Sequence, residues 1–137
     1  MAIQTQTTSF KAECWQAIHN LLTDTLKIAL YTGNAALDAS TTAYAAANEI
    51  TGTGYTAGGA NITGVTISSS GYTVFASFNN PSWSGALTAR YALIYNASKA
   101  NRSVAVLDFG ADKTSVSTFT ITLPANTATT ALLRSSN

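Results

Sequence analysis

One predicted hairpin near the middle of the chain constrains the fold more than any other feature. Residues 89–97 read ARYALIYNA, residues 103–110 read SVAVLDFG, and the joint between them is short and polar. Both arms place aliphatic, aromatic or β-branched side chains on both faces of the strand that they predict. A strand that is apolar on both faces is typical of one that is buried on both faces. We therefore expect this pair at the centre of a sheet or between two layers.

Several other short segments predict strands around this hairpin, separated by turns rich in Gly, Asn, Ser and Pro. These segments are residues 26–31, 49–56, 60–70, 72–78, 118–123 and 129–134. In the third of them the apolar positions change parity, which predicts a β-bulge at Gly64. Many short strands at close spacing predict a mainly β chain, an antiparallel β-sandwich or jelly roll of about eight strands. We expect one such domain over residues 9–137.

A single helix is predicted near the N-terminus, from Phe10 to Leu22, with Ser9 as its N-cap. Apolar residues recur there at three- and four-residue spacing, which is typical of a helix with one buried face. Cys14 falls on that face and is expected to pack as a small hydrophobe. Trp15 lies beside it, and we favour the core for this side chain over the alternative, an anchor against another subunit. Residues 1–8 are polar and are expected to form an extended arm.

The charge content is unusually low. Only 9% of the residues are charged, against roughly 25% in typical soluble domains. A surface with so few charges tolerates burial against partners, which favours a protein that works within an assembly. The net charge is +1 and no basic cluster occurs, so direct nucleic-acid binding is not expected. No apolar stretch approaches the ~20 residues of a membrane span, and the N-terminus does not resemble a secretory signal, so synthesis in a cytoplasm without export by that route is expected.

Few residues are candidates for chemistry. The one histidine, His19, lies beside the apolar face of the predicted helix, where a structural or interface role is expected. The segment 52–59 is rich in glycine but lacks the Lys and Ser or Thr of a phosphate-binding loop. Asp108 and Asp112 flank Gly110, so they are candidates for a carboxylate pair or a Ca²⁺ site, although a structural role in the turn is favoured. We expect no catalytic site, metal or cofactor.

Two long stretches resemble a family of small structural proteins of tailed bacteriophages. They are DTLKIALYTGNAALDASTTAYAAANEITGTGYTAGGANITGVTI and ARYALIYNASKANRSVAVLDFGADKTSVSTFTITLP, and the strings GTGYTAGG, ALIYN and AVLDFG carry the likeness most clearly. The resemblance covers about residues 9–133. It implies a capsid cement or decoration protein with a jelly-roll-like fold, located on the surface of the virion. Its implied partners are the major capsid protein and further copies of itself, as a dimer or trimer.

A capsid-binding role requires contact residues, and we predict them in three regions and in the helix. The regions are residues 2–8, residues 33–48 and the loop around Trp83. The individual candidates are Ala2, Ile3, Gln4, Thr5, Trp15 and Trp83. We expect that deletion of residues 2–8 weakens attachment and leaves the domain folded.

Two other classes of function stay open. A phage tail or fibre-associated protein, or a receptor-binding module, would use exposed aromatic side chains for stacking. The candidates are Tyr44, Tyr55, Tyr72 and Trp83. A virion-associated glycosidase would use Asp108 and Asp112, and is the less favoured of the two.

Overall fold

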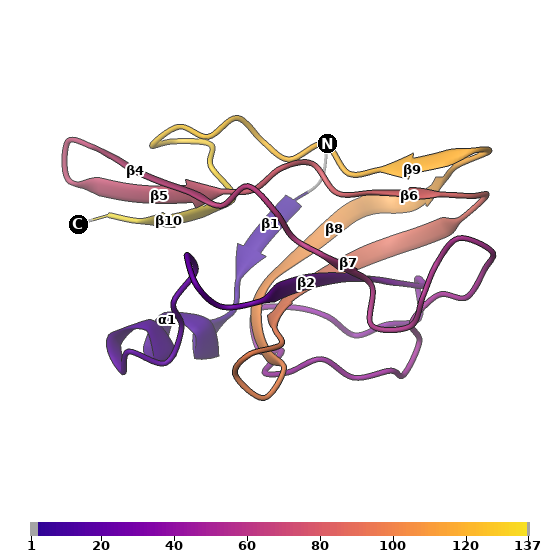
Figure 1. The fold of residues 1–137 in the computed structure, drawn as a ribbon, viewed down its shortest axis with the longest axis horizontal. Coiled ribbons are helices and arrows are strands. Elements are labelled where there is room, and N and C mark those ends of the chain that lie inside the picture. The colour runs from indigo at the N-terminus through magenta and orange to yellow at the C-terminus, as the bar shows by residue number, and fades with distance from the viewer. Residues whose placement is uncertain (1–2, 137) are drawn as a thin grey trace.

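The structure is a computed structural model that describes residues 3–136, and it is a mainly β, antiparallel fold with two layers (Figure 1). One layer is a five-stranded sheet in the order β1-β8-β7-β2-β3, and the other holds a three-stranded sheet, β10-β5-β4, and a two-stranded one, β6-β9. The strands are β1 (Ile3–Gln6), β2 (Leu26–Tyr31), β3 (Ala60–Asn61), β4 (Thr66–Ser70), β5 (Thr73–Ser77), β6 (Ser82–Ser84), β7 (Thr88–Asn96), β8 (Arg102–Thr114), β9 (Thr118–Thr120) and β10 (Leu133–Ser135). One helix, α1 (Thr8–Trp15), is found within the described residues. The predicted antiparallel sandwich with an N-terminal helix is confirmed.

The central hairpin is β7–β8, as predicted. It occupies the middle of the five-stranded sheet, with Leu93 opposite Val106 on β8 and opposite Ala29 on β2. Both of its faces are buried, because each is covered by a different part of the chain. The main core lies between the two layers and includes Ile94 and Ala105. The opposite face forms a smaller core with Tyr31 and Tyr95, which residues of the segment 35–44 cover.

The helix is shorter than predicted. It ends at Trp15 instead of Leu22, and its N-cap is Thr7, whose Oγ1 accepts a hydrogen bond from the backbone N–H of Phe10 at 3.3 Å. Ala17 adopts a left-handed φ of 59°, which takes the chain out of the helix. Of the apolar residues beyond this point, Leu21 packs against the core from the loop, whereas Leu22 is 67% exposed. Cys14 is exposed, so its predicted packing is wrong.

The polar N-terminal segment is part of the sheet. Residues 3–6 are extended, as predicted, but they form β1, which pairs with β8 from Ile3 opposite Asp108 to Gln6 opposite Ala105. A separate arm is therefore wrong for these residues, because β1 completes the edge of the sheet and is followed by the buried cap residue Thr7. The first two residues, among them the candidate Ala2, lie outside the described residues.

Three other local predictions are wrong. Residues 49–56 form no strand, and only an isolated bridge joins Glu49 to Tyr31. Gly64 is not a bulge within one strand, because it lies between β3 and β4, which belong to different sheets. Trp83 lies in β6 instead of a loop, and its side chain is 6% exposed. In each case tertiary packing overrides a local pattern that was too short to fix the path of the chain.

Candidate functional site

An apolar groove lies between α1 and the sheet β10-β5-β4. It has a volume of about 490 Å³. One wall is the sheet face that carries Ile67, Ala76 and Leu133, which are cross-strand neighbours. The other wall is the helix and the loop that follows it. The lining residues are Gln6, Phe10, Lys11, Ala12, Cys14, Trp15, Leu21, Ile67, Val74, Phe75, Ala76, Leu133, Arg134 and Ser135.

The helix is anchored in the core through Phe10, whereas its last residue is exposed. Phe10, in the first half of the helix, is 4% exposed and belongs to the main core, where its ring lies 4.9 Å from that of His19. Thr7 caps the same end and donates its backbone N–H to the carbonyl of Val104 at 3.0 Å. The far end carries Trp15, whose side chain is 93% exposed. The predicted core position of Trp15 is therefore wrong, and its alternative as an anchor stays a prediction.

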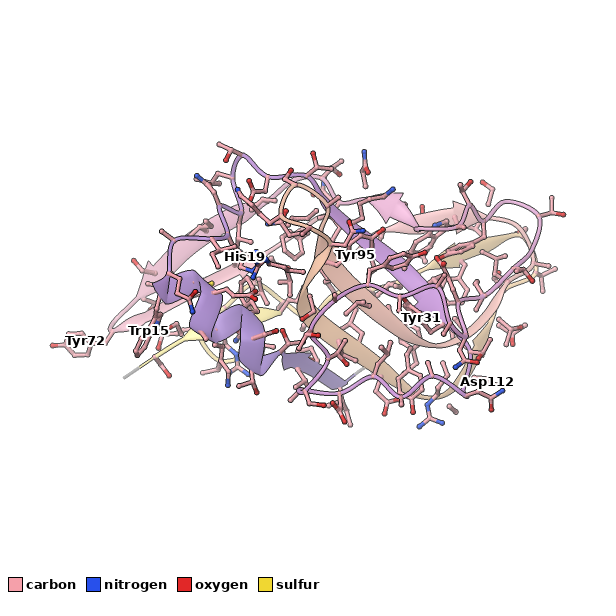
Figure 2. All side chains as sticks on the ribbon, turned by 90° about the horizontal axis from the view of Figure 1, so that it is seen from below. Trp15, His19, Tyr31, Tyr72, Tyr95 and Asp112 are labelled. Atoms are coloured by element: carbon pink, nitrogen blue, oxygen red, sulfur yellow. The ribbon has the colours of Figure 1, made fainter. Side chains whose placement is uncertain are left out.

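Exposed apolar side chains gather at this end of the molecule. Within the described residues seven large hydrophobic side chains are exposed, and three of them, Trp15, Ile67 and Val74, line the groove. A fourth, Tyr72, is 88% exposed and stands at the tip of the β4–β5 hairpin. Figure 2 shows Tyr72 and Trp15 at the same end, with Tyr72 pointing away from the body. Such a concentration on one face is typical of a surface that contacts another macromolecule.

The charges around the groove have one sign. The lining contains no carboxylate, and Lys11 is exposed there, whereas the side chain of Arg134 lies on the other face of the sheet and donates to the carbonyl of Thr129 at 2.6 Å. The nearest acid on the helix, Glu13, is directed elsewhere, since it binds Arg102 and His19. The groove therefore suits a partner that presents apolar side chains next to carboxylates.

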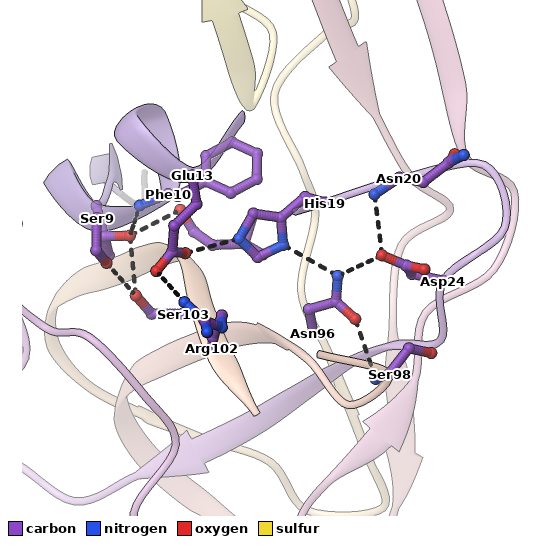
Figure 3. Close-up of polar contacts among 12 residues, drawn as sticks. Ser9, Phe10, Glu13, His19, Asn20, Asp24, Asn96, Ser98, Arg102 and Ser103 are labelled. Atoms are coloured by element: carbon purple, nitrogen blue, oxygen red, sulfur yellow. Dashed lines mark hydrogen bonds and ion pairs between the residues drawn. The ribbon is translucent and has the colours of Figure 1, made fainter. Parts of the chain in front are cut away.

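A buried polar network fixes the loop after α1 to the central hairpin (Figure 3). The carboxylate of Glu13 lies 2.8 Å from Nε2 of His19 and 3.0 Å from Nη1 of Arg102. The amide of Asn96 lies 3.0 Å from Nδ1 of His19 and donates to Asp24 at 2.7 Å. Both ring nitrogens of His19 are thus engaged, and its side chain is 0% exposed. The expected structural role agrees with this geometry, since no substrate reaches the ring.

Asp24 closes the other end of this network. Burial by itself raises the pKa of a carboxyl group. Here hydrogen bonds from the backbone of Asn20, from Asn96 and from Lys99 outweigh burial and lower the pKa of Asp24 to about 2. The side chain of Asp24 is 7% exposed, and Nζ of Lys99 lies 3.0 Å from it. These bonds hold the loop, and with it α1, at its place beside the groove.

The two aspartates that flank Gly110 have different surroundings. Asp108 accepts hydrogen bonds from Nε of Arg90 at 2.9 Å and from the backbone of Gly110 at 2.8 Å, and these bonds lower its pKa. Asp112 is exposed at the end of the molecule far from Tyr72 (Figure 2). Among residues 3–136 no three side chains of the metal-binding types cluster.

Most of the aromatic side chains proposed for stacking are occupied within the fold. Tyr44 stacks on Tyr95 with ring centroids 4.7 Å apart, and its hydroxyl donates to Glu49 at 2.7 Å. The hydroxyl of Tyr55 also donates to Glu49, at 2.5 Å. Burial, the bond to Glu49 and its negative charge raise the pKa of Tyr44 to about 12 and that of Tyr55 further. Glu49 thereby joins the loops that cover the sheet.

The structure exposes some of the candidate contact residues and buries others. Trp83 packs edge-on against Phe119 and is buried, so it offers little surface to a partner. Ile3 is 66% exposed, while Gln4 and Thr5 are partly buried in β1. Sequence reasoning missed Ile67 and Val74, because their alternation is that of half-buried strands and carries no signal of exposure.

Searches with protein-family models, among curated proteins and among solved structures found no match for this chain. Among residues 3–136, no helix is long and apolar enough to cross a membrane.

Proposed function

We propose that this chain is a structural protein of a tailed-bacteriophage virion, a cement or decoration protein that binds the assembled lattice of the major capsid protein. The observation that carries the proposal is the apolar groove with Trp15 exposed at its mouth. The sequence resemblance supplies the identity of the assembly. The low charge content supports a binding role over a catalytic one. The same role is supported by the polar side chains, because many of them form the hydrogen bonds that hold loops together.

The physical mechanism is stabilisation by selective binding. A protein that binds the assembled shell but not its separate subunits adds its binding free energy to the assembled state. The groove meets apolar side chains of the capsid protein, and Lys11 faces a carboxylate beside them. Few charged groups lose water on contact, so the desolvation cost is low. Trp15 is the expected anchor, because exposed tryptophans that fill a partner's pocket dominate many interfaces.

The first experiment measures binding of the purified protein to phage particles that lack it. Trp15→Ala is expected to weaken binding by about 2 kcal/mol, roughly 30-fold. Its melting temperature should not change, since the side chain is 93% exposed in the free chain. Val116→Ala is the matched control, because Val116 is 91% exposed at a distant bend and its loss should leave binding unchanged. Equal binding of Trp15→Ala and the unsubstituted protein would contradict the assigned contact.

The number of copies in each virion tests the location. Hundreds of copies, in a simple ratio to the major capsid protein, are expected for a shell component. A handful of copies would place the protein in the tail instead. That outcome would shift attention to Tyr72, the one candidate stacking side chain that is strongly exposed. Absence from the particle would overturn the proposal.

A further inference from the structure

The β4 strand is an open edge of the three-stranded sheet. Within the described residues it pairs only with β5, and all five of its residues are exposed. Figure 1 shows the β4–β5 hairpin projecting from the body at the end opposite to β6–β9. The hairpin is closed by Gly71 and Tyr72, and Gly71 has the positive φ, 59°, that the first position of a type II′ turn requires. The edge is therefore both accessible and well formed.

Unpaired backbone groups line this edge. In a hairpin closed by two residues, the pair beside the turn exchanges hydrogen bonds, and bonded and non-bonded pairs then alternate along the ladder. Ser70 and Thr73 are the pair beside the turn. The N–H and C=O groups of Ile67 and Ser69 consequently point away from β5, toward a further strand.

The other sheet edges are protected, whereas β4 is not. Natural edge strands avoid unwanted pairing through charged side chains, proline, short length or cover. β3 has only two residues, and β6 and β9 have only three each. β1 and β10 lie side by side, with the amide of Gln6 donating to the backbone of Arg134 at 2.7 Å. The β4 strand has none of these devices. No Asp, Glu, Lys or Arg occurs anywhere between Glu49 and Arg90.

We propose that β4 pairs with β4 of a second copy of this chain, antiparallel and with the two-fold axis at Ser68. In this register Ile67 of one copy lies opposite Ser69 of the other, so the outward backbone groups of both strands bond each other. Small hydroxyl side chains face each other across the axis, a favourable cross-strand pairing. A second copy fits better than a charged partner strand, because two identical edges without charged side chains do not repel each other.

The size of the contact indicates a reversible dimer. Five-residue strands alone bury less than the ~800 Å² per partner of a standard interface. The register also brings Tyr72 of one copy level with Gly64 of the other, which has no side chain. Tyr72 is 88% exposed, and covering it adds on the order of 150 Å² per copy. We expect a dissociation constant on the order of micromolar.

The dimer also has a consequence for attachment, and this step rests on the proposed function. The two-fold axis of an antiparallel strand pair is perpendicular to the sheet, so both copies present the same sheet face to the same side. Both apolar grooves, with Ile67 and Val74 on their sheet walls, then open toward one surface. Two linked contacts raise the overall affinity for a lattice by roughly 10²- to 10⁴-fold over one.

The test is sedimentation or light scattering of the full chain over a concentration series. The unsubstituted protein is expected to pass from monomer to dimer. Ser68→Lys places two like charges opposite each other at the axis, on the sheet face that points away from the groove, and should raise the dissociation constant at least ~10-fold. Val116→Lys, with the same added charge at a distant exposed bend, should dimerise normally. Thermal melting confirms that each variant is folded.

A charge-swap experiment sharpens the test. A mixture of Ser68→Lys and Ser68→Glu should form heterodimers more readily than either variant forms homodimers, because the axis then joins opposite charges. A monomer at all concentrations, or a dimer insensitive to Ser68→Lys, would overturn the proposed pairing. Failure of the proposed function looks different: the isolated protein would still dimerise through β4 but would not bind particles, with or without Trp15.

Discussion

The carboxylate of Asp24 gives the most direct test of how the groove is held in place. Its pKa is about 2 in the folded chain, against an ordinary value of 3.8. A shift of this size is worth at most ~2.5 kcal/mol, and screening by nearby solvent reduces it to about 1–2 kcal/mol. Because the folded pKa is the lower one, the stabilisation is fully present above about pH 4 and is lost as the pH falls toward 2.

Asp24→Asn is therefore expected to lower the free energy of unfolding by about 1–2 kcal/mol at pH 7. The difference from the unsubstituted protein should fall to about half at pH 3 and to roughly a sixth at pH 2, where the native carboxyl is itself about half protonated. Urea denaturation at a series of pH values measures it. Asp112→Asn is the control, because this exposed carboxylate has no hydrogen-bond partner among the described residues. A loss of equal size at pH 2 and pH 7 would refute the electrostatic account and indicate packing instead.

Two further predictions concern the backbone. Deletion of residues 2–8 should destabilise the domain by at least ~3 kcal/mol in urea denaturation, since it removes β1 and the buried cap residue Thr7. A deletion variant with unchanged stability would show that this segment is a dispensable arm. Gly59→Ala should cost far more stability than Gly110→Ala, although the two glycines have φ values of 82° and 83°. A Cβ at Gly59 would lie 1.9 Å from the carbonyl oxygen of Ile28, whereas none of the described atoms lies within 4 Å of a Cβ at Gly110. Equal losses in melting temperature for the two variants would refute the steric clash at Gly59 as the cause.

The sequence predicted those parts of the fold that depend on strongly patterned strands. β2 begins and ends where the pattern placed it, and β7–β8 is central because its residues are apolar on both faces. These signals are reliable because burial on both faces requires apolar residues at every position. The class of fold followed from the same strands together with the turns between them.

The errors occurred where long-range contacts decide the structure. The spacing of Ile18 and Leu21 continued a helical period, but a buried polar network with His19 at its centre requires the chain to leave the helix after Trp15. Partners such as Asn96 lie far away in the sequence, so no local pattern could show this. The polar residues of β1 were likewise uninformative, because their stability as a strand comes from β8.

The groove shows why a candidate contact site was harder to predict than the fold. Trp15 is exposed only because α1 stops there and is fixed at Phe10, and neither fact is local to Trp15. Ile67 and Val74 look like core residues in the sequence, since strands usually bury such side chains. They stay exposed because they lie nearer the tip of the β4–β5 hairpin, outside the main core to which Ala76 and Leu133 belong. An apolar residue on a hairpin that extends beyond its cover is therefore the feature that marks this surface, and only the assembled fold reveals it.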